Sequence, residues 1–180
     1  MTNRNSEVTS NWKLCAMWLN DCECLNECVK QKLIASKLTF DEFAQSLRDG
    51  VSICNLLEYL VPSVLDFEQL NQNVFPIRSL CIKNVELYLN TCKGAPFYLS
   101  ENDLFAPDML YDLNMEPVIR SLSILSNLKC VQARCNGGFY LNPDDMNDNS
   151  VYGQVYLDGQ MEDTGNYQDM APFILGRMHG

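Results

Sequence analysis

Apolar side chains recur every three or four residues through most of the first 130 positions, and this helical period constrains the fold more than any other feature. The positions that carry it are Trp12, Cys15, Ala16, Leu19, Cys22, Phe40, Phe43, Ala44, Leu47, Ile53, Leu56, Leu57, Leu60, Cys81, Val85, Tyr88, Leu89, Cys92, Val118, Leu122 and Leu125. No segment of residues 1–130 alternates apolar and polar side chains over five or more positions, as a half-buried strand would. The sequence therefore predicts an all-α fold with four main helices and two or more short ones.

Capping and stop signals set the expected ends of these helices. Ser10 is a favoured N-cap residue, and Thr39 to Glu42 has the form of a capping box. Gly50 suits the left-handed position after a helix. Residues 23–38 show no clear period, so they are predicted to be a variable connection.

After Leu128 the helical period is lost, and Gly, Asn and Asp dominate. Turns are predicted at 136–138 and at 142–145. We expect a largely irregular C-terminal tail, although it keeps several large apolar side chains. The predicted organisation is an N-terminal extension at 1–9, a helical domain at 10–130 and a tail at 131–180.

The negative charge of the chain is concentrated near its C-terminal end. Residues 1–140 carry 12 basic and 16 acidic side chains, whereas residues 141–180 carry one basic and seven acidic ones. This balance repels nucleic acid and anionic membranes, so neither is expected as a partner. No run approaches the roughly 20 apolar residues of a membrane span, and the first ten residues lack the apolar stretch of a signal peptide. We expect a cytoplasmic protein.

Neither a metal site nor a catalytic site is expected. The nine cysteines are odd in number and several lie at core spacing, which favours reduced, buried thiols. Cys22, Cys24 and Cys28 cluster, but they lack the Cys-x2-Cys spacing of zinc sites. The single histidine, His179, cannot complete a nucleophile–base pair with any cluster in the helical domain, and no Gly-rich phosphate loop occurs. The predicted sets of catalytic, cofactor-binding and metal-binding residues are therefore empty.

Two stretches resemble the signatures of calponin-homology (CH) domains. The first signature is a Leu-Arg-Asp-Gly turn that runs into an apolar helix, which residues 43–57 resemble (FAQSLRDGVSICNLL). The second is matched by residues 103–112 (DLFAPDMLYD) followed by 118–122 (VIRSL). The resemblance covers about residues 10–128 and implies a CH fold.

The first helix and the tail together resemble the N-terminus of the Vav proteins, which are guanine nucleotide exchange factors for Rho-family GTPases. Residues 14–22 (LCAMWLNDC) carry the likeness at the first helix. In that family an acidic segment with several tyrosines follows the CH domain, and here Tyr152, Tyr156 and Tyr167 occupy that region. Tyr167 begins a Tyr-Gln-Asp-Met sequence that most resembles the inhibitory motif, although the acidic run is sparser than in the family. The resemblance does not extend to an exchange domain, which leaves both a fragment and a short natural form open.

The resemblance implies a regulatory, autoinhibitory and scaffolding module rather than an enzyme. Its implied partners are the exchange domain and neighbouring modules of a Vav-like protein, a tyrosine kinase and, indirectly, a Rho or Rac GTPase. The implied phosphorylation sites are Tyr167, Tyr152 and Tyr156. A second reading is a CH protein of the actin cytoskeleton. Only weak actin binding is expected from a single acidic domain, because actin is itself acidic.

Overall fold

The segments with a helical apolar period all fold as helices in the computed structural model, which describes residues 9–135 and 137–146. The elements are α1 (Asn11–Asp21), α2 (Glu27–Ile34), α3 (Phe40–Leu47), α4 (Val51–Leu60), the 3-10 turn η1 (Phe67–Gln69), α5 (Arg78–Lys93), the 3-10 turn η2 (Glu101–Asp103), α6 (Met115–Ser126), α7 (Lys129–Gln132) and α8 (Pro143–Met146). No strand occurs among the described residues, and the all-α prediction is confirmed.

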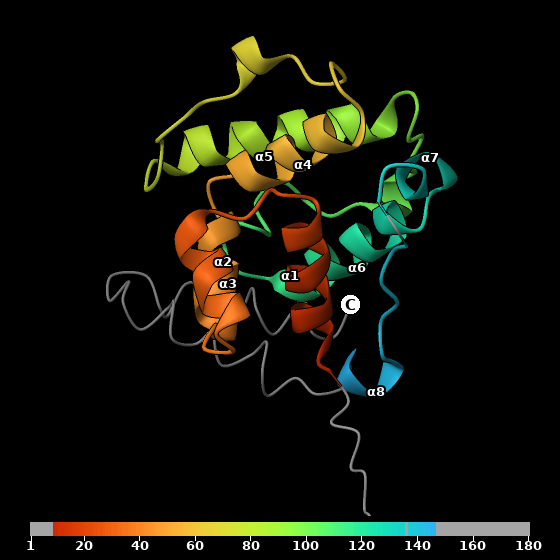
Figure 1. Cartoon of the computed structure of the whole chain (residues 1–180). Coiled ribbons are helices and arrows are strands. Elements are labelled where there is room, and N and C mark those ends of the chain that lie inside the picture. The colour runs from red at the N-terminus through yellow and green to blue at the C-terminus, as the bar shows by residue number, and fades with distance from the viewer. Residues whose placement is uncertain (1–8, 136, 147–180) are drawn as a thin grey trace, which may run out of the picture.

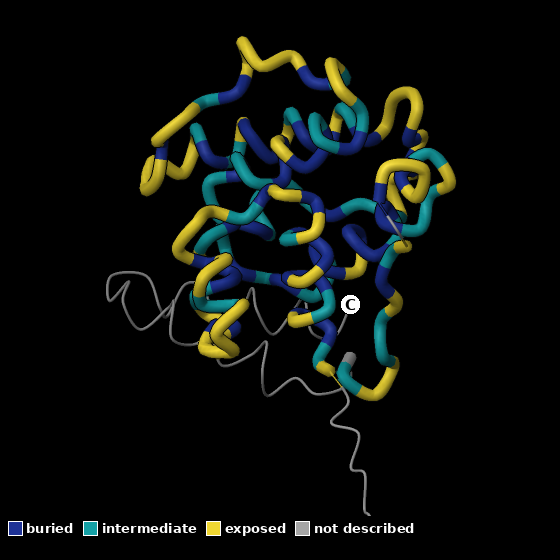
Figure 2. The backbone as a smooth tube through the Cα atoms, in the orientation of Figure 1, coloured by how far each residue is buried: buried dark blue, intermediate teal, exposed yellow. Residues whose placement is uncertain are grey.

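The longest helix, α5, packs against α4 at one end of the domain (Figure 1). The helix α1 lies centrally and contacts α2, α3 and α6. Short turns and loops join these helices, and one loop between α4 and α5 arches over the outer side of α5. Most exposed positions lie in such loops and on the outward helix faces, while the inner faces are buried (Figure 2).

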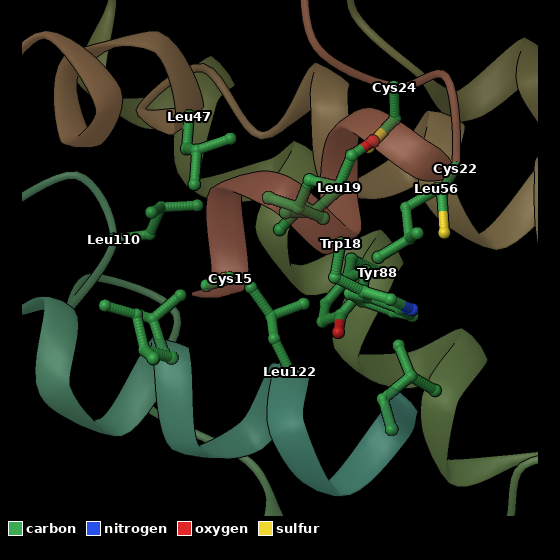
Figure 3. Packing of buried hydrophobic residues seen from close by; sticks show 14 of the residues in the cluster. Cys15, Trp18, Leu19, Cys22, Cys24, Leu47, Leu56, Tyr88, Leu110 and Leu122 are labelled. Atoms are coloured by element: carbon green, nitrogen blue, oxygen red, sulfur yellow. The ribbon is translucent and has the colours of Figure 1, made fainter. Parts of the chain in front are cut away.

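The core contains the side chains that the helical spacing predicted. Six positions expected to be buried are all no more than 5% exposed: Leu47, Ile53, Leu57, Leu89, Leu122 and Leu125. Trp12 and Trp18 are buried as well. Figure 3 shows Cys15, Trp18 and Leu19 of α1 in the same core cluster as Leu122 of α6 and Tyr88 of α5. Helix α1 is therefore the central element for α2, α3 and α6, whereas α4 and α5 pack mainly on each other.

The capping box at the start of α3 is confirmed. The backbone N–H of Glu42 donates to Thr39 Oγ1 at 3.2 Å, and the backbone N–H of Thr39 donates to Glu42 Oε2 at 3.1 Å. Gly50 adopts the predicted left-handed conformation with φ +76°. A Cβ atom there would lie 2.9 Å from the Cβ of Asn84, so the site excludes side chains by contact as well as by conformation.

The prediction of a variable connection at residues 23–38 is wrong, because this segment contains the eight-residue helix α2. Asn26 caps this helix by accepting a hydrogen bond from the backbone N–H of Val29 at 2.9 Å. Val29 is also its only buried residue, so the helix lacks an apolar period. Six helices of eight residues or more lie within the described ranges, together with the shorter elements η1, η2, α7 and α8. The segment from Pro107 to Leu113 is a series of turns.

Candidate regulatory site

Residues 137–145 run from the end of α6 back to the start of α1, and we call this segment the strap (Figure 1). Phe139 is its main anchor: its side chain is buried and its ring centroid lies 5.8 Å from that of Trp18. Its backbone N–H donates to Ser126 Oγ at 3.0 Å. Its carbonyl oxygen accepts from Ser123 Oγ at 2.8 Å and from Asn127 Nδ2 at 2.9 Å. The last turn of α6 therefore holds the strap by side chains that satisfy its buried backbone groups.

Gly138 allows the strap to approach α6 this closely. A Cβ atom at this position would lie 2.5 Å from the carbonyl oxygen of Ser126 and 2.6 Å from Asn127 Oδ1. Gly138 is therefore a contact point where a side chain would collide with the end of α6.

The far end of the strap caps helix α1. Asp145 Oδ2 accepts a hydrogen bond from the backbone N–H of Asn11 at 2.7 Å. The fully buried Asn11 side chain also donates to the Asn142 carbonyl oxygen at 3.1 Å and accepts from the Asn142 backbone N–H at 2.6 Å. A carboxylate at a helix N-terminus is favourable because the first N–H groups are unpaired and the helix dipole is positive there. Ser10, the predicted N-cap residue, makes no side-chain capping bond, so the cap comes from 134 residues further along the chain.

The three tyrosines predicted as regulatory sites, Tyr152, Tyr156 and Tyr167, lie outside the described residues. The described part of the chain ends at Met146, directly after the Asp145 cap at the start of α1. The structure thus shows how the beginning of the acidic region is held, at a fixed point on the helical domain.

The turn at Arg48 to Gly50 is fixed by a fully buried amide, Asn84 of α5. Asn84 Nδ2 donates to the carbonyl oxygens of Asp49 and of Asn71, at 2.8 Å each. Its Oδ1 accepts from the Asn71 backbone N–H at 2.8 Å. One side chain in this way joins the turn, helix α5 and the loop that follows η1.

The two stretches with CH-type signatures contact each other through Arg48 and Tyr111. Arg48 Nε donates to the carbonyl oxygen of Tyr111 at 2.8 Å, and its guanidinium carbon lies 4.5 Å from the Tyr111 ring centroid. Arg78 covers the same ring at 5.1 Å and pairs with Asp112. Phe75, which is half-exposed, contributes a further ring at 5.2 Å from Arg48. These cation–π contacts and hydrogen bonds give the two stretches a structural role.

The cysteines are mostly core residues, as predicted. All nine are free; seven are buried, Cys130 is half-buried and Cys28 is exposed. Burial raises the pKa of Cys54 and Cys92 to about 12, so both thiols are neutral at physiological pH.

Among the described residues no group of three or more His, Cys, Asp and Glu side chains is arranged to hold a metal ion. None of the described helices has both the length and the apolar character needed to cross a bilayer.

A cleft of about 560 Å³ lies between the loop around η1 and the outer side of α5. Its lining mixes the acidic Asp66 and Glu86 with the basic Lys83 and several amides. The lining therefore shows no preference for ligands of either charge.

Comparison with known proteins matches the calponin homology (CH) domain family model to residues 9–127. The chain belongs to the calponin-homology family. Its CH domain is similar to that of Drosophila melanogaster Protein vav, with 38% identity over 122 residues, covering 67% of this chain and 15% of that protein. Human Proto-oncogene vav is 31% identical over 159 residues, covering 85% of this chain and 18% of that protein. The chain thus spans less than a fifth of the length of these relatives.

A solved structure titled "Autoinhibited Vav1" matches with a TM-score of 0.69 and 29% identity, covering 82% of this chain and 26% of that one. Since 82% of 180 residues is about 148, the likeness extends beyond the 119 residues of the CH family match. The predicted Vav resemblance is confirmed for the CH domain, and the strap lies beyond the end of the family match, after helix α7.

The apolar period predicts the buried face of every long apolar helix, but no sequence pattern predicts that the strap packs on the helical domain. Its anchors Asn11 and Phe139 lie far apart in the sequence, and neither belongs to a periodic pattern. The available signals were a glycine pair before an aromatic residue and an aspartate pair after a proline. Both signals predict turns, and neither indicates which distant helix end the turn will contact.

Proposed function

We propose that this chain is a regulatory module of a Vav-like exchange factor for Rho or Rac GTPases, acting in the cytoplasm and in autoinhibition rather than in catalysis. The observation that carries the proposal is the similarity to autoinhibited Vav1 over 82% of the chain, which is more than the CH domain alone. In this proposal the CH domain braces the acidic tail, and the tail occupies the GTPase-binding face of an exchange domain. The relatives named above are Vav proteins, which favours this function over an actin-binding one.

The strap supports the bracing part of the proposal. Phe139 and Asp145 hold the beginning of the acidic region on α6 and α1. A tail that starts from a fixed point has a higher effective concentration at a neighbouring surface than one on a loose linker. Docking of the tail then needs less intrinsic affinity.

Tail tyrosine phosphorylation is the proposed switch, with Tyr167 as the main site and Tyr152 and Tyr156 as accessory sites. A neutral tyrosine can bury its ring and donate one hydrogen bond. Phosphorylation by a tyrosine kinase adds about −1.5 to −2 charges and three acceptor oxygens, which an apolar pocket cannot hold. The segment between Asn147 and Gly180 is already acidic, with five acidic residues and one basic residue, so the added charge also increases repulsion.

The test joins the whole chain to the exchange domain of a Vav relative and measures nucleotide exchange on Rac with and without a tyrosine kinase. Kinase is expected to activate the wild-type fusion by about 5–150-fold, which corresponds to a coupling of about 1–3 kcal/mol. Tyr167→Phe should stay inhibited, because it keeps the ring but cannot be phosphorylated. Tyr152→Phe and Tyr156→Phe are matched controls that should retain most of the activation. Equal activation of wild type and Tyr167→Phe would exclude Tyr167 as the main site.

A filament co-sedimentation assay separates this function from actin binding. The isolated chain is expected to remain in the supernatant at physiological salt, and to show no exchange activity by itself. Low-micromolar binding to filaments would contradict the proposal.

A further inference from the structure

Two buried thiols from opposite ends of the described chain lie against each other. Cys22 follows the last residue of α1, and Cys135 lies between α7 and the strap. Their Sγ atoms are 3.1 Å apart across a sequence separation of 113 residues. Both side chains are free in the structure, and they are 0% and 7% exposed, respectively.

We infer that Cys22 and Cys135 form a reversible intramolecular disulfide when the protein meets a peroxide. A disulfide bond requires the sulfurs to approach to roughly 2.0 Å, which is about 1 Å closer than in the thiol pair. The bond would link the end of α1 covalently to Cys135, two residues before the strap. This inference does not rest on the proposed function, since the pair belongs to the folded domain itself.

The chemistry assigns different roles to the two thiols. Cys135 is the more exposed, so its sulfur attacks one oxygen of hydrogen peroxide, giving a sulfenic acid and one water. The sulfur of Cys22 then attacks the sulfur of Cys135, and the departing hydroxide takes the Cys22 proton and leaves as a second water. Two thiols lose two electrons and two protons, and one peroxide is reduced to two waters. Burial, followed by the hydrogen bond with Cys135, raises the pKa of the Cys22 thiol, which disfavours Cys22 as the first thiol to react with peroxide.

Neighbouring cysteines are less well placed for this reaction. Cys24 is buried, but its thiol donates to the carbonyl oxygen of Leu19 at 3.2 Å. Cys28 is exposed on α2 and Cys130 lies near the Pro96 carbonyl oxygen, at 3.7 Å. Proximity therefore selects one pair from the nine thiols.

The direct test treats the whole 180-residue chain with a small excess of hydrogen peroxide, unfolds it in denaturant, alkylates the remaining thiols and maps the tryptic peptides without reduction. We expect a mass loss of about 2 Da before alkylation. Seven alkylated cysteines are expected instead of nine, with peptide 14–30 joined to peptide 135–177. Dithiothreitol should restore nine. Nine alkylated thiols after peroxide, or dimers as the only disulfide product, would overturn the inference.

Variants identify which of the four cysteines in peptide 14–30 takes part, since Cys15, Cys22, Cys24 and Cys28 all lie in it. Cys22→Ala should abolish the link, whereas Cys24→Ala and Cys28→Ala should keep it. Thermal unfolding of the oxidised wild type gives an independent readout that needs no variant to fold. Its midpoint should rise by roughly 5–15 °C over the reduced form, because a long loop is closed in the unfolded chain. A link that persists in Cys22→Ala would refute the assignment.

Discussion

Replacing Phe139 by alanine tests whether the strap is part of the folded domain or only rests on it. The Phe139 side chain is 6% exposed and packs on Trp18, so the substitution removes a large buried ring and leaves a cavity beside α1. Truncation of a buried phenylalanine to alanine costs about 3–5 kcal/mol. With an m-value of about 2 kcal/mol per M, the midpoint of urea unfolding should fall by roughly 1.5–2.5 M.

The adjacent residue gives the matched control. Tyr140 is 74% exposed in the same extended segment, so Tyr140→Ala should change the unfolding free energy by no more than about 0.5 kcal/mol. Helix content from circular dichroism and the urea midpoint are measured on the same samples. If Phe139→Ala loses less than about 1 kcal/mol, as little as its neighbour, the strap does not contribute to the core, and our account of how the tail is braced is wrong.

Three further predictions concern single side chains. Gly138→Ala should lower the unfolding free energy by about 1–3 kcal/mol in urea titrations, because its Cβ atom has no space beside the Ser126 carbonyl oxygen; an unchanged midpoint would refute the close approach. Asn84→Leu should cost about 2–4 kcal/mol by the same measurement, since it leaves buried backbone groups of Asp49 and the facing loop unpaired; a neutral result would show that water replaces the amide. The Lys32 ion pair, followed by the cap at α3, lowers the pKa of the Glu42 carboxyl from its ordinary 4.5. This pair stabilises the fold above that value and is lost as the pH falls through the lower folded pKa, so Glu42→Gln should lose less stability than wild type between about pH 6 and pH 3.

The residue pattern alone determined which faces of the long helices are buried. Leu47, Leu57 and Leu122 each belong to an apolar stripe on their own helix. Such a stripe must be buried, whichever element covers it. The capping box of α3 and the left-handed Gly50 were also predictable. Each is a local arrangement whose energy depends on residues within three or four positions.

Tertiary structure decided everything that depends on distant partners. Helix α2 has one buried residue, so only its cap and its packing on α1 and α3 define it. Asn11 and Asp145 are 134 residues apart, and the sequence shows neither as a partner of the other. The contact between the sulfurs of Cys22 and Cys135 is equally invisible in the sequence, because the two residues belong to segments 113 positions apart. A helical period reports only that a face will be buried, whereas the identity of the covering residue emerges when helices from across the chain pack together.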